Sequence, residues 1–436
     1  MFQAILFAYS VLYLAFLLLY LPAVIFQAVF RGKKTRVLKR IFPRFETENR
    51  NNSQQSVWIH SVSVGEVNAA LPLIRKLVDE DFRVFLSTTT ATGQQVAQAS
   101  AGPEVTLLYF PLDFKITCRA FLKKVRPDAV VVMETEIWPN FLETAQRQKV
   151  PVVFINGRIS DNSFKKYLRI SPLLKPLFSR IRLMCMQSEI DSERIRKIGA
   201  PDRILRVTGN MKFDYSLEIP EEKKNLQAQL SAFLRPEPDS LVWICGSTKP
   251  NEEEILSRIY ANLKEKFPRL ALLIAPRHPH RGAEVAEIFR NKGFRTIQRS
   301  RFHESREGEG REVLVLDTVG ELAALYEIAD IVFMGGSLVP TGGQNIIEPA
   351  FFGKAILFGP SMSNFREIAE IFKEKNGALQ ATSPAELEQL LFRLLPDNRE
   401  RALLGKNARK IMEDNRGAVN RNLDAVKQVI SDNDAP

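Results

Sequence analysis

The sequence has little cysteine, little histidine and no charged residue among its first thirty positions. Its 436 residues include 3 cysteines and 4 histidines. The cysteines lie far apart in apolar runs and form no CxxC pair, which argues against a disulfide framework or a zinc site. We therefore expect reduced cysteines buried in the core of the protein, and no metal.

The uncharged N-terminus contains an apolar run from Ala4 to Phe30, longer than the roughly 20 residues that a membrane-spanning helix needs. A cleavable signal peptide would instead carry positive charge before its apolar run. Pro22 leaves a monotopic anchor as the lesser alternative to a single-pass helix. Because basic residues follow the run, the positive-inside rule predicts that the rest of the chain is cytoplasmic; they are Arg31, Lys33, Lys34, Arg36, Lys39 and Arg40.

The remainder has the composition of a globular protein, with 45% hydrophobic and 25% charged residues. Its net charge of +11 indicates an anionic partner. Nucleic acid, a membrane surface and a phosphorylated substrate all fit that charge.

Apolar strand-like runs alternate with helical stretches in two series, which is typical of parallel sheets with crossover helices. The sequence therefore predicts an α/β protein with two Rossmann-like, doubly wound domains facing a central cleft. The predicted strands begin at Val57, Val84, Leu107, Ala129, Val152 and Leu183, and then at Leu241, Leu270, Phe294, Val313, Ile331 and Ala355. The predicted parts are a membrane helix (1–30), a basic juxtamembrane segment (31–55), a first domain (56–214), a linker (215–239) and a second domain with the terminal helices (240–436).

The motif HSVSVGE ends the first predicted strand and begins a helix near Glu66. Ser63 and Gly65 belong to the same turn, which points backbone N–H groups beyond the strand ends, where α/β sheets bind ligands. A carboxylate at this position can act as a general base. Alternatively, Glu66 only complements the helix dipole, and the residues alone do not decide between the two.

Two further motifs of the first domain carry charge. Glu134 and Glu136 follow the strand that begins at Ala129, and residues two apart on an extended segment share a face. One carboxylate would stabilise charge and the other would orient a partner. Lys212, in GNMKFD, is a candidate for meeting a phosphate or a sugar carboxylate.

Candidate anion-binding groups in the second domain again follow strands. Ser247 and Thr248 lie in a small-residue turn, and Arg277 offers a planar fork to a phosphate. In GGSLVPTGGQNIIEPAFFGK, glycines such as Gly343 permit close approach to a phosphate, while Glu348 is placed to accept ribose hydroxyls.

A basic amphipathic segment runs from Ser163 to Leu183. It suits anionic lipid headgroups, although a solvated helix would have the same pattern.

Taken in order, HSVSVGE, ETEIWPN, NGR, GNMKFD, GSTKPNEEE, PRHPHR, VGEL and GGSLVPTGGQNIIEPA resemble the family of transferases for the acid sugar 3-deoxy-D-manno-octulosonic acid (Kdo) of Gram-negative bacteria. The resemblance covers almost the whole chain. It implies a GT-B glycosyltransferase of the inner membrane that inverts the anomeric centre and needs neither metal nor cofactor. Its implied donor is CMP-Kdo, and its implied acceptor is the lipid A precursor.

Carried onto this chain, the resemblance implies Glu66 as the base and Glu134 and Lys212 as charge-stabilising residues. His280 and Gln344 depart from the family's usual pattern, which puts their own roles in doubt. The implied CMP contacts are Pro276, Arg277, Val319, Gly320, Glu321, Asn345, Ile346, Ile347 and Glu348.

Two rival functions differ in their predicted partners. A membrane-tethered nucleic-acid or lipid-binding protein would need a continuous basic stripe with stacking aromatics, whereas the basic residues here gather beside the apolar run and on one amphipathic segment. We therefore expect no nucleic-acid partner. An epimerase or another transferase of the same fold would bind a UDP-sugar, since fold does not fix function.

Overall fold

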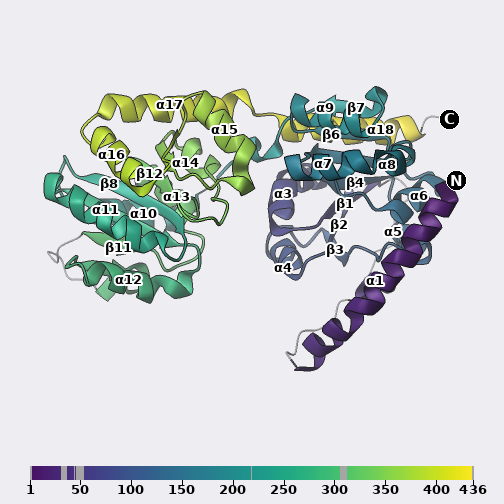
Figure 1. The fold of residues 1–436 in the computed structure, drawn as a ribbon, viewed down its shortest axis with the longest axis horizontal. Helices are drawn as coiled ribbons and strands as arrows, with labels where there is room; N and C mark the ends of the chain where they lie inside the picture. The colour runs from purple at the N-terminus through teal and green to yellow at the C-terminus, as the bar shows by residue number, and fades with distance from the viewer. Residues whose placement is uncertain are drawn as a thin grey trace. The chain divides into compact units, whose positions relative to one another are not determined.

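The structure, a computed structural model, describes residues 2–30, 37–43, 45, 54–217, 219–304 and 312–434, except for the side chains of 20–30, 303, 304 and 434. Most of the basic juxtamembrane segment predicted at 31–55 thus lies outside the described residues. The chain divides into a first unit, Met1–Asp214 with Arg416–Pro436, and a second unit, Tyr215–Asn415 (Figure 1).

The first unit is built on a parallel seven-stranded sheet with the order β3-β2-β1-β4-β5-β6-β7. Its central strands are buried along their length, because apolar side chains on both faces are covered by helices. The order reverses between β1 and β4, which lie side by side with His60 opposite Val132. The strands are β1 (Ser56–Ser61), β2 (Arg83–Thr88), β3 (Thr106–Tyr109), β4 (Ala129–Met133), β5 (Val152–Gly157), β6 (Leu183–Met186) and β7 (Leu205–Val207).

Two apolar clusters form the core of this unit, one on each face of the sheet. The helices are α1 (Phe2–Phe30), α2 (Val37–Ile41), α3 (Val64–Asp79), α4 (Ala91–Ser100), α5 (Lys115–Val125), α6 (Pro139–Arg147), α7 (Asp161–Arg169), α8 (Ser171–Phe178), α9 (Glu189–Ile198) and α18 (Ala418–Asp434), with 3₁₀ turns η1 (Asp202–Ile204) and η2 (Met211–Asp214). The predicted basic segment forms α7 and α8, which are separate helices on either side of Ile170.

The C-terminal helix α18 packs on the first unit, where Figure 1 shows it in yellow. Its apolar side chains, among them Leu423 and Val426, join the cluster formed by α3 and α4. The Asp214 carboxylate accepts the N–H groups of Gly417 and Val419 at the start of α18. The predicted second domain, 240–436, is therefore wrong for its last residues, which complete the core of the first unit.

The second unit has a parallel seven-stranded sheet with the order β10-β11-β9-β8-β12-β13-β14. Here the switch point lies between β8 and β12. The strands are β8 (Leu241–Thr248), β9 (Leu270–Pro276), β10 (Thr296–Gln298), β11 (Val313–Val315), β12 (Ile331–Met334), β13 (Ala355–Phe358) and β14 (Leu379–Gln380). The prediction of two doubly wound α/β domains is confirmed by these two sheets.

The helices of this unit belong to a sheet whose two faces are both buried, because the neighbours Trp243 and Ile244, which point to opposite faces, are fully buried. They are α10 (Glu221–Leu234), α11 (Glu252–Lys266), α12 (Gly282–Arg290), α13 (Leu322–Leu325), α14 (Ile347–Phe351), α15 (Arg366–Glu374), α16 (Pro384–Leu394) and α17 (Asn398–Asp414), with 3₁₀ turns η3 (Pro279–Arg281), η4 (Arg299–Glu304), η5 (Tyr326–Ile328) and η6 (Ser363–Phe365). The predicted linker at 215–239 is also corrected, because α10 belongs to this unit: Gln227 donates to the Ala324 carbonyl at 3.0 Å.

Candidate active site

Glu66 is held at the switch point of the first sheet by the turn that starts α3. Ser63 is the N-cap of this helix, and its hydroxyl donates to Glu66 Oε1 at 2.9 Å. The other carboxylate oxygen accepts the N–H of Val62 at 2.8 Å. This reciprocal arrangement is a variant of the capping box, so the helix-capping interpretation of Glu66 has a geometric basis.

The surroundings of the same carboxyl group also shift its pKa. The pKa of Glu66 is raised from its ordinary value of 4.5 to about 7, chiefly by burial and also by the negative charges of Glu134 and Glu136, against the lowering effect of the hydrogen bonds from Val62 and Ser63. A general base works best when its pKa lies near the operating pH. Glu66 thus combines a fixed position with a pKa suited to proton abstraction.

Glu134 and Glu136 follow β4, the neighbour of β1, so the structure brings both to the strand ends beside Glu66. Glu134 has a positive φ of 56°, and its carboxylate lies 3.6 Å from the guanidinium of Arg158. Burial and the charge of Glu134 raise the pKa of Glu136. The two carboxylates predicted from the motif METEIWPN, Glu134 and Glu136, thus lie in one acidic cluster with Glu66.

Arg158 was not predicted as a site residue, although it belongs to the motif NGR at the end of β5. The Thr135 hydroxyl donates to the Arg158 carbonyl at 2.6 Å and accepts from its N–H at 3.2 Å. Arg158 reaches Glu134 because β4 and β5 are neighbours in the sheet. The local sequence does not determine which strands are neighbours, so this contact could not be predicted.

Lys212 lies in η2, which packs against α3. Buried Asn156, near the end of β5, accepts the N–H of Met211 at 3.0 Å and so fixes this turn beside that strand end. The structure thus brings the segment of Lys212 onto the helix that carries Glu66. Gly65 has open space around it, since an added Cβ would meet only the Ser63 hydroxyl at 3.9 Å.

In the second unit, the charge of Arg277 acts on the carboxyl group of Glu348. Burial raises the pKa of Glu348, and this effect outweighs the lowering by a hydrogen bond from Asn345 and by the positive charge of Arg277. Asn345 donates to Glu348 at 3.2 Å and accepts the N–H of Ile347 at the same distance. These residues therefore form one cluster after β9 and β12.

Other residues carried over from the resemblance have different surroundings. The side chains of Ile346 and Ile347 are buried in the core, so a ligand can meet only their backbone. Val319 is 84% exposed, whereas Glu321 already pairs with Arg299 at 3.1 Å. Pro276 is buried as the last residue of β9, and Lys223 donates to the Gly320 carbonyl at 2.8 Å.

The glycine-rich loop after β12 is fixed by a buried carboxylate that the sequence did not single out for this role. Glu252 accepts the N–H groups of Gly336, Ser337 and Leu338 at 2.6, 2.9 and 2.9 Å. These three N–H groups are therefore already hydrogen-bonded within the protein.

Gly343 and the turn at the end of β8, with Ser247 and Thr248, also have structural roles near this loop. Gly343 has φ 71° and donates to the Gly336 carbonyl at 2.7 Å. Ser247 has a positive φ of 56°, and Thr248 donates to the buried Glu253 at 2.9 Å. The exposed Arg277 side chain thus remains the main candidate for phosphate contact in this unit.

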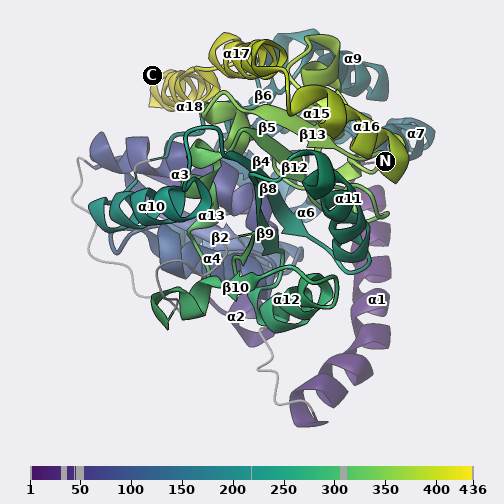
Figure 2. The same ribbon diagram turned by 90° about the vertical axis from the view of Figure 1, so that its left-hand side faces the viewer.

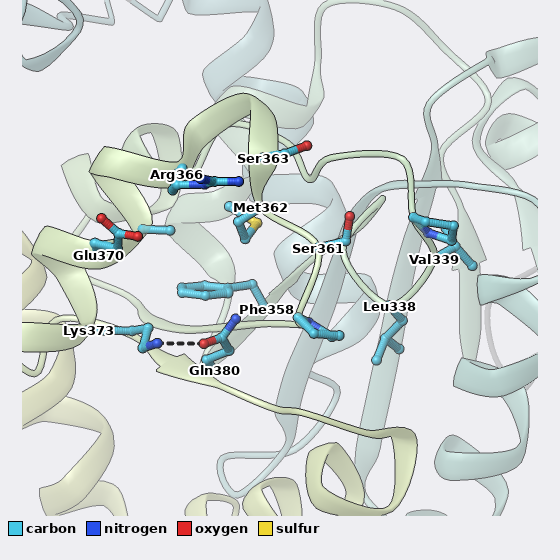
Figure 3. A pocket seen from close by; sticks show the side chains of 13 residues that line it. Leu338, Val339, Phe358, Ser361, Met362, Ser363, Arg366, Glu370, Lys373 and Gln380 are labelled. Atoms are coloured by element: carbon cyan, nitrogen blue, oxygen red, sulfur yellow. Dashed lines mark hydrogen bonds between the residues drawn. The ribbon is translucent and has the colours of Figure 1, made fainter. Parts of the chain in front are cut away.

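A cavity of about 510 Å³ lies beside the loop, between its Leu338–Pro340 portion and α15 (Figure 3). Phe358 and Met362 form its apolar wall, while Lys373 donates to Gln380 at 2.6 Å at its edge. None of the predicted site residues lines this cavity.

Comparison with known proteins assigns the family. A family model described as 3-Deoxy-D-manno-octulosonic-acid transferase (kdotransferase) matches residues 39–215. The 3-deoxy-D-manno-octulosonic acid transferase of Haemophilus influenzae is 35% identical over 382 residues, which are 87% of this chain and 88% of that protein. The chain belongs to the Kdo transferase family.

Further relatives agree with the assignment, which makes the chain a glycosyltransferase. The Kdo transferase of Bordetella pertussis is 31% identical over 85% of this chain and 86% of its own length. Among solved structures, the UDP-GlcNAc 2-epimerase from Neisseria meningitidis has a TM-score of 0.57 at 13% identity, covering 87% of this chain and 100% of that chain. A glycosyltransferase from Rickettsia africae has the same TM-score and identity, covering 87% of this chain and 99% of that chain. These structures support the GT-B fold of the Kdo transferase.

Proposed function

We propose that this Kdo transferase moves Kdo from CMP-Kdo to the lipid A precursor at the cytoplasmic face of the inner membrane. The observation that carries the proposal is the buried Glu66 carboxyl, fixed at the switch point of the first sheet with a pKa of about 7. Family membership supplies the sugar, and the apolar helix α1 supports a lipid acceptor.

The proposed reaction is a single displacement. Glu66 takes the proton of an acceptor hydroxyl while the oxygen of that hydroxyl bonds to the anomeric carbon of Kdo. The bond from that carbon to the phosphate oxygen breaks, and CMP leaves with the electron pair. Attack from the face opposite to the leaving group inverts the anomeric centre.

Positive side chains offset the charge of the two anionic groups of the donor. We propose that Arg277 binds the phosphate of CMP and that Glu348 accepts ribose hydroxyls, since the two lie in one cluster. Lys212 and Glu134 would stabilise charge near the reacting centre. These contacts take the place of a divalent ion.

The direct test is incubation of the purified protein with CMP-Kdo and lipid A precursor, followed by mass spectrometry of the lipid. We expect a mass increase of one or more Kdo residues, unchanged by EDTA. Loss of transfer in EDTA would contradict metal independence alone.

The second candidate, a reaction on a UDP-sugar, draws on the fold shared with the UDP-GlcNAc 2-epimerase. Calorimetry with CMP and UDP separates the two functions, because only the proposed transferase should prefer CMP.

A further inference from the structure

The polar side chains in the first half of α1 all lie on one face of the helix. Between Phe2 and Leu19 they are Gln3, Tyr9, Ser10 and Tyr13, whose spacing places them within about one third of the helix circumference. We call this face, with the buried Leu6 at its centre, the polar strip of α1. A helix surrounded by lipid has no need to gather its polar groups on one side.

The polar strip is docked on the first unit, where the start of α1 lies beside α6 (Figures 1 and 2). Gln3 donates to Glu143 at 2.8 Å, and Ser10 accepts from the side-chain amide of Asn140 at 3.0 Å. Lys115 at the start of α5 donates to Gln3 at 3.1 Å. Since Asn140 is fully buried, its contact with Ser10 belongs to the interior of the unit.

Tyr9 and Tyr13 extend the same contact. The Tyr9 hydroxyl is hydrogen-bonded to the buried carboxylate of Asp113. The Tyr13 ring packs on Phe114 with 5.2 Å between ring centroids. The first twelve residues or so of α1 are thus fixed to the first unit.

The chain returns to the same unit after α1. The Arg40 side chain donates to the Phe110 carbonyl at 2.9 Å, and its own carbonyl accepts the N–H of Leu112 at 3.0 Å. Both sides of the apolar run are therefore tied to one folded unit. A single crossing would put them on opposite sides of the bilayer, and two crossings need about 40 residues. Only positions 14 to 39 separate Tyr13 from Arg40, which is 39 − 13 = 26 residues.

The face of α1 opposite the polar strip is apolar and exposed. Phe7, Leu12 and Leu19 are 72%, 71% and 83% exposed. Ile116, on the neighbouring α5, is 84% exposed, and that surface of α5 is otherwise basic, with Lys115, Arg119 and Lys123 all exposed. An apolar face beside a row of cations matches a bilayer with anionic headgroups.

We propose that α1 lies in the plane of the membrane surface, with its polar strip docked on the first unit and its opposite face in the boundary between headgroups and acyl chains. The predicted single-pass helix is replaced by a monotopic one. The N-terminus then stays on the same side of the membrane as the catalytic units.

A cysteine placed before Met1 on a short Gly-Ser extension tests the side. The described cysteines, Cys118, Cys185 and Cys245, are buried and give little background. A membrane-impermeant maleimide should label the full-length protein in inverted vesicles and leave it unlabelled in intact spheroplasts. Labelling in spheroplasts would overturn the proposal.

Disulfide trapping tests the docking in the same membranes. Ser10→Cys with Asn140→Cys should cross-link on mild oxidation, because the two side chains touch. Val11→Cys with Asn140→Cys is the matched control, since Val11 is 50% exposed and lies away from the polar strip. Equal cross-linking of both pairs, or of neither in protein that still binds CMP, would contradict the docked helix.

Flotation with vesicles that contain phosphatidylglycerol tests the occupant of the exposed face. Phe7→Glu with Leu12→Glu should reduce co-flotation of the full chain at least tenfold, whereas Leu403→Glu, at a leucine of the second unit that is 58% exposed, should leave it unchanged. A change in oligomeric mass with unchanged flotation would mean that a second copy covers this face, and the proposal would fail. These readouts are independent of Kdo transfer.

Discussion

At the scale of single residues, Glu66 combines a helix cap and a titrating group that one substitution can separate. Glu66→Gln keeps an acceptor for the cap but cannot take a proton. We expect transfer to fall by about 10² to 10⁴-fold. The change in stability should stay within about 0.3 to 1 kcal/mol, as for a charge near a helix N-terminus.

The matched control is Glu386→Gln, because Glu386 and Ser383 form the same capping pattern at the start of α16. It should cost similar stability and leave transfer intact. If both variants retain transfer within a few-fold of the parent, Glu66 is a cap and not the base.

The acid limb of the pH–rate profile should reflect the carboxylates around Glu66. A base with a pKa of about 7 is inactive when protonated, so transfer should fall as the pH drops through about 7. Neutralising Glu134 removes a negative charge that raises this pKa, so Glu134→Gln should move the limb to lower pH. Glu136→Gln should move it in the same direction by less. A limb that stays in place or moves upward in Glu134→Gln would contradict this electrostatic coupling.

Arg277 provides a test of donor binding in the second unit. Arg277→Ala removes one charge-assisted hydrogen bond to phosphate, worth about 1.5 to 3 kcal/mol, so CMP affinity should fall by about 10 to 150-fold in calorimetry. Arg290→Ala, an exposed arginine that pairs with Glu287 on α12, is the control and should leave CMP affinity unchanged. Equal affinities for CMP in the two variants would place the phosphate elsewhere.

At the scale of elements, the first unit depends on a helix from the far end of the chain. Leu423 of α18 is 5% exposed in the core, so Leu423→Ala should destabilise the first unit by about 2 to 5 kcal/mol. The neighbouring Asp424 is exposed, and Asp424→Ala should change stability by less than about 0.5 kcal/mol. Hydrogen exchange of the α3 amides measures the stability of both variants. Equal protection of these amides in the two variants would argue that α18 is not part of this core.

The elements also show which parts of the fold can be predicted from sequence patterns. All twelve predicted strands are present, because long apolar runs between turn residues are unambiguous in a sheet covered on both faces. The strands β7 and β14 were missed; they have three and two residues, and neither contains a fully buried residue. The unit to which α10 and α18 belong depends on packing, which helical periodicity does not contain.

At the scale of the whole molecule, the site was predictable where it follows the topology of parallel sheets. Glu66 and Glu134 follow strands that turned out to be neighbours at the switch point, so their proximity is a consequence of the fold. The pairing of Glu252 with residues 336–338 was not predictable, because it joins segments more than 80 positions apart. The polar strip of α1 was visible in the spacing of Gln3, Ser10 and Tyr13, but the overall hydropathy of the run obscured it.

The central claim is that the protein transfers Kdo from CMP-Kdo to a lipid acceptor with Glu66 as the base. The measurement that tests it most directly is mass spectrometry of lipid A precursor after incubation with CMP-Kdo and either the parent enzyme or Glu66→Gln. We predict Kdo-bearing lipid from the parent enzyme and, from the variant, initial rates lower by about 10² to 10⁴-fold at matched CMP affinity. No Kdo-bearing lipid from a folded, CMP-binding parent enzyme would contradict the function, and equal rates from both proteins would contradict the mechanism.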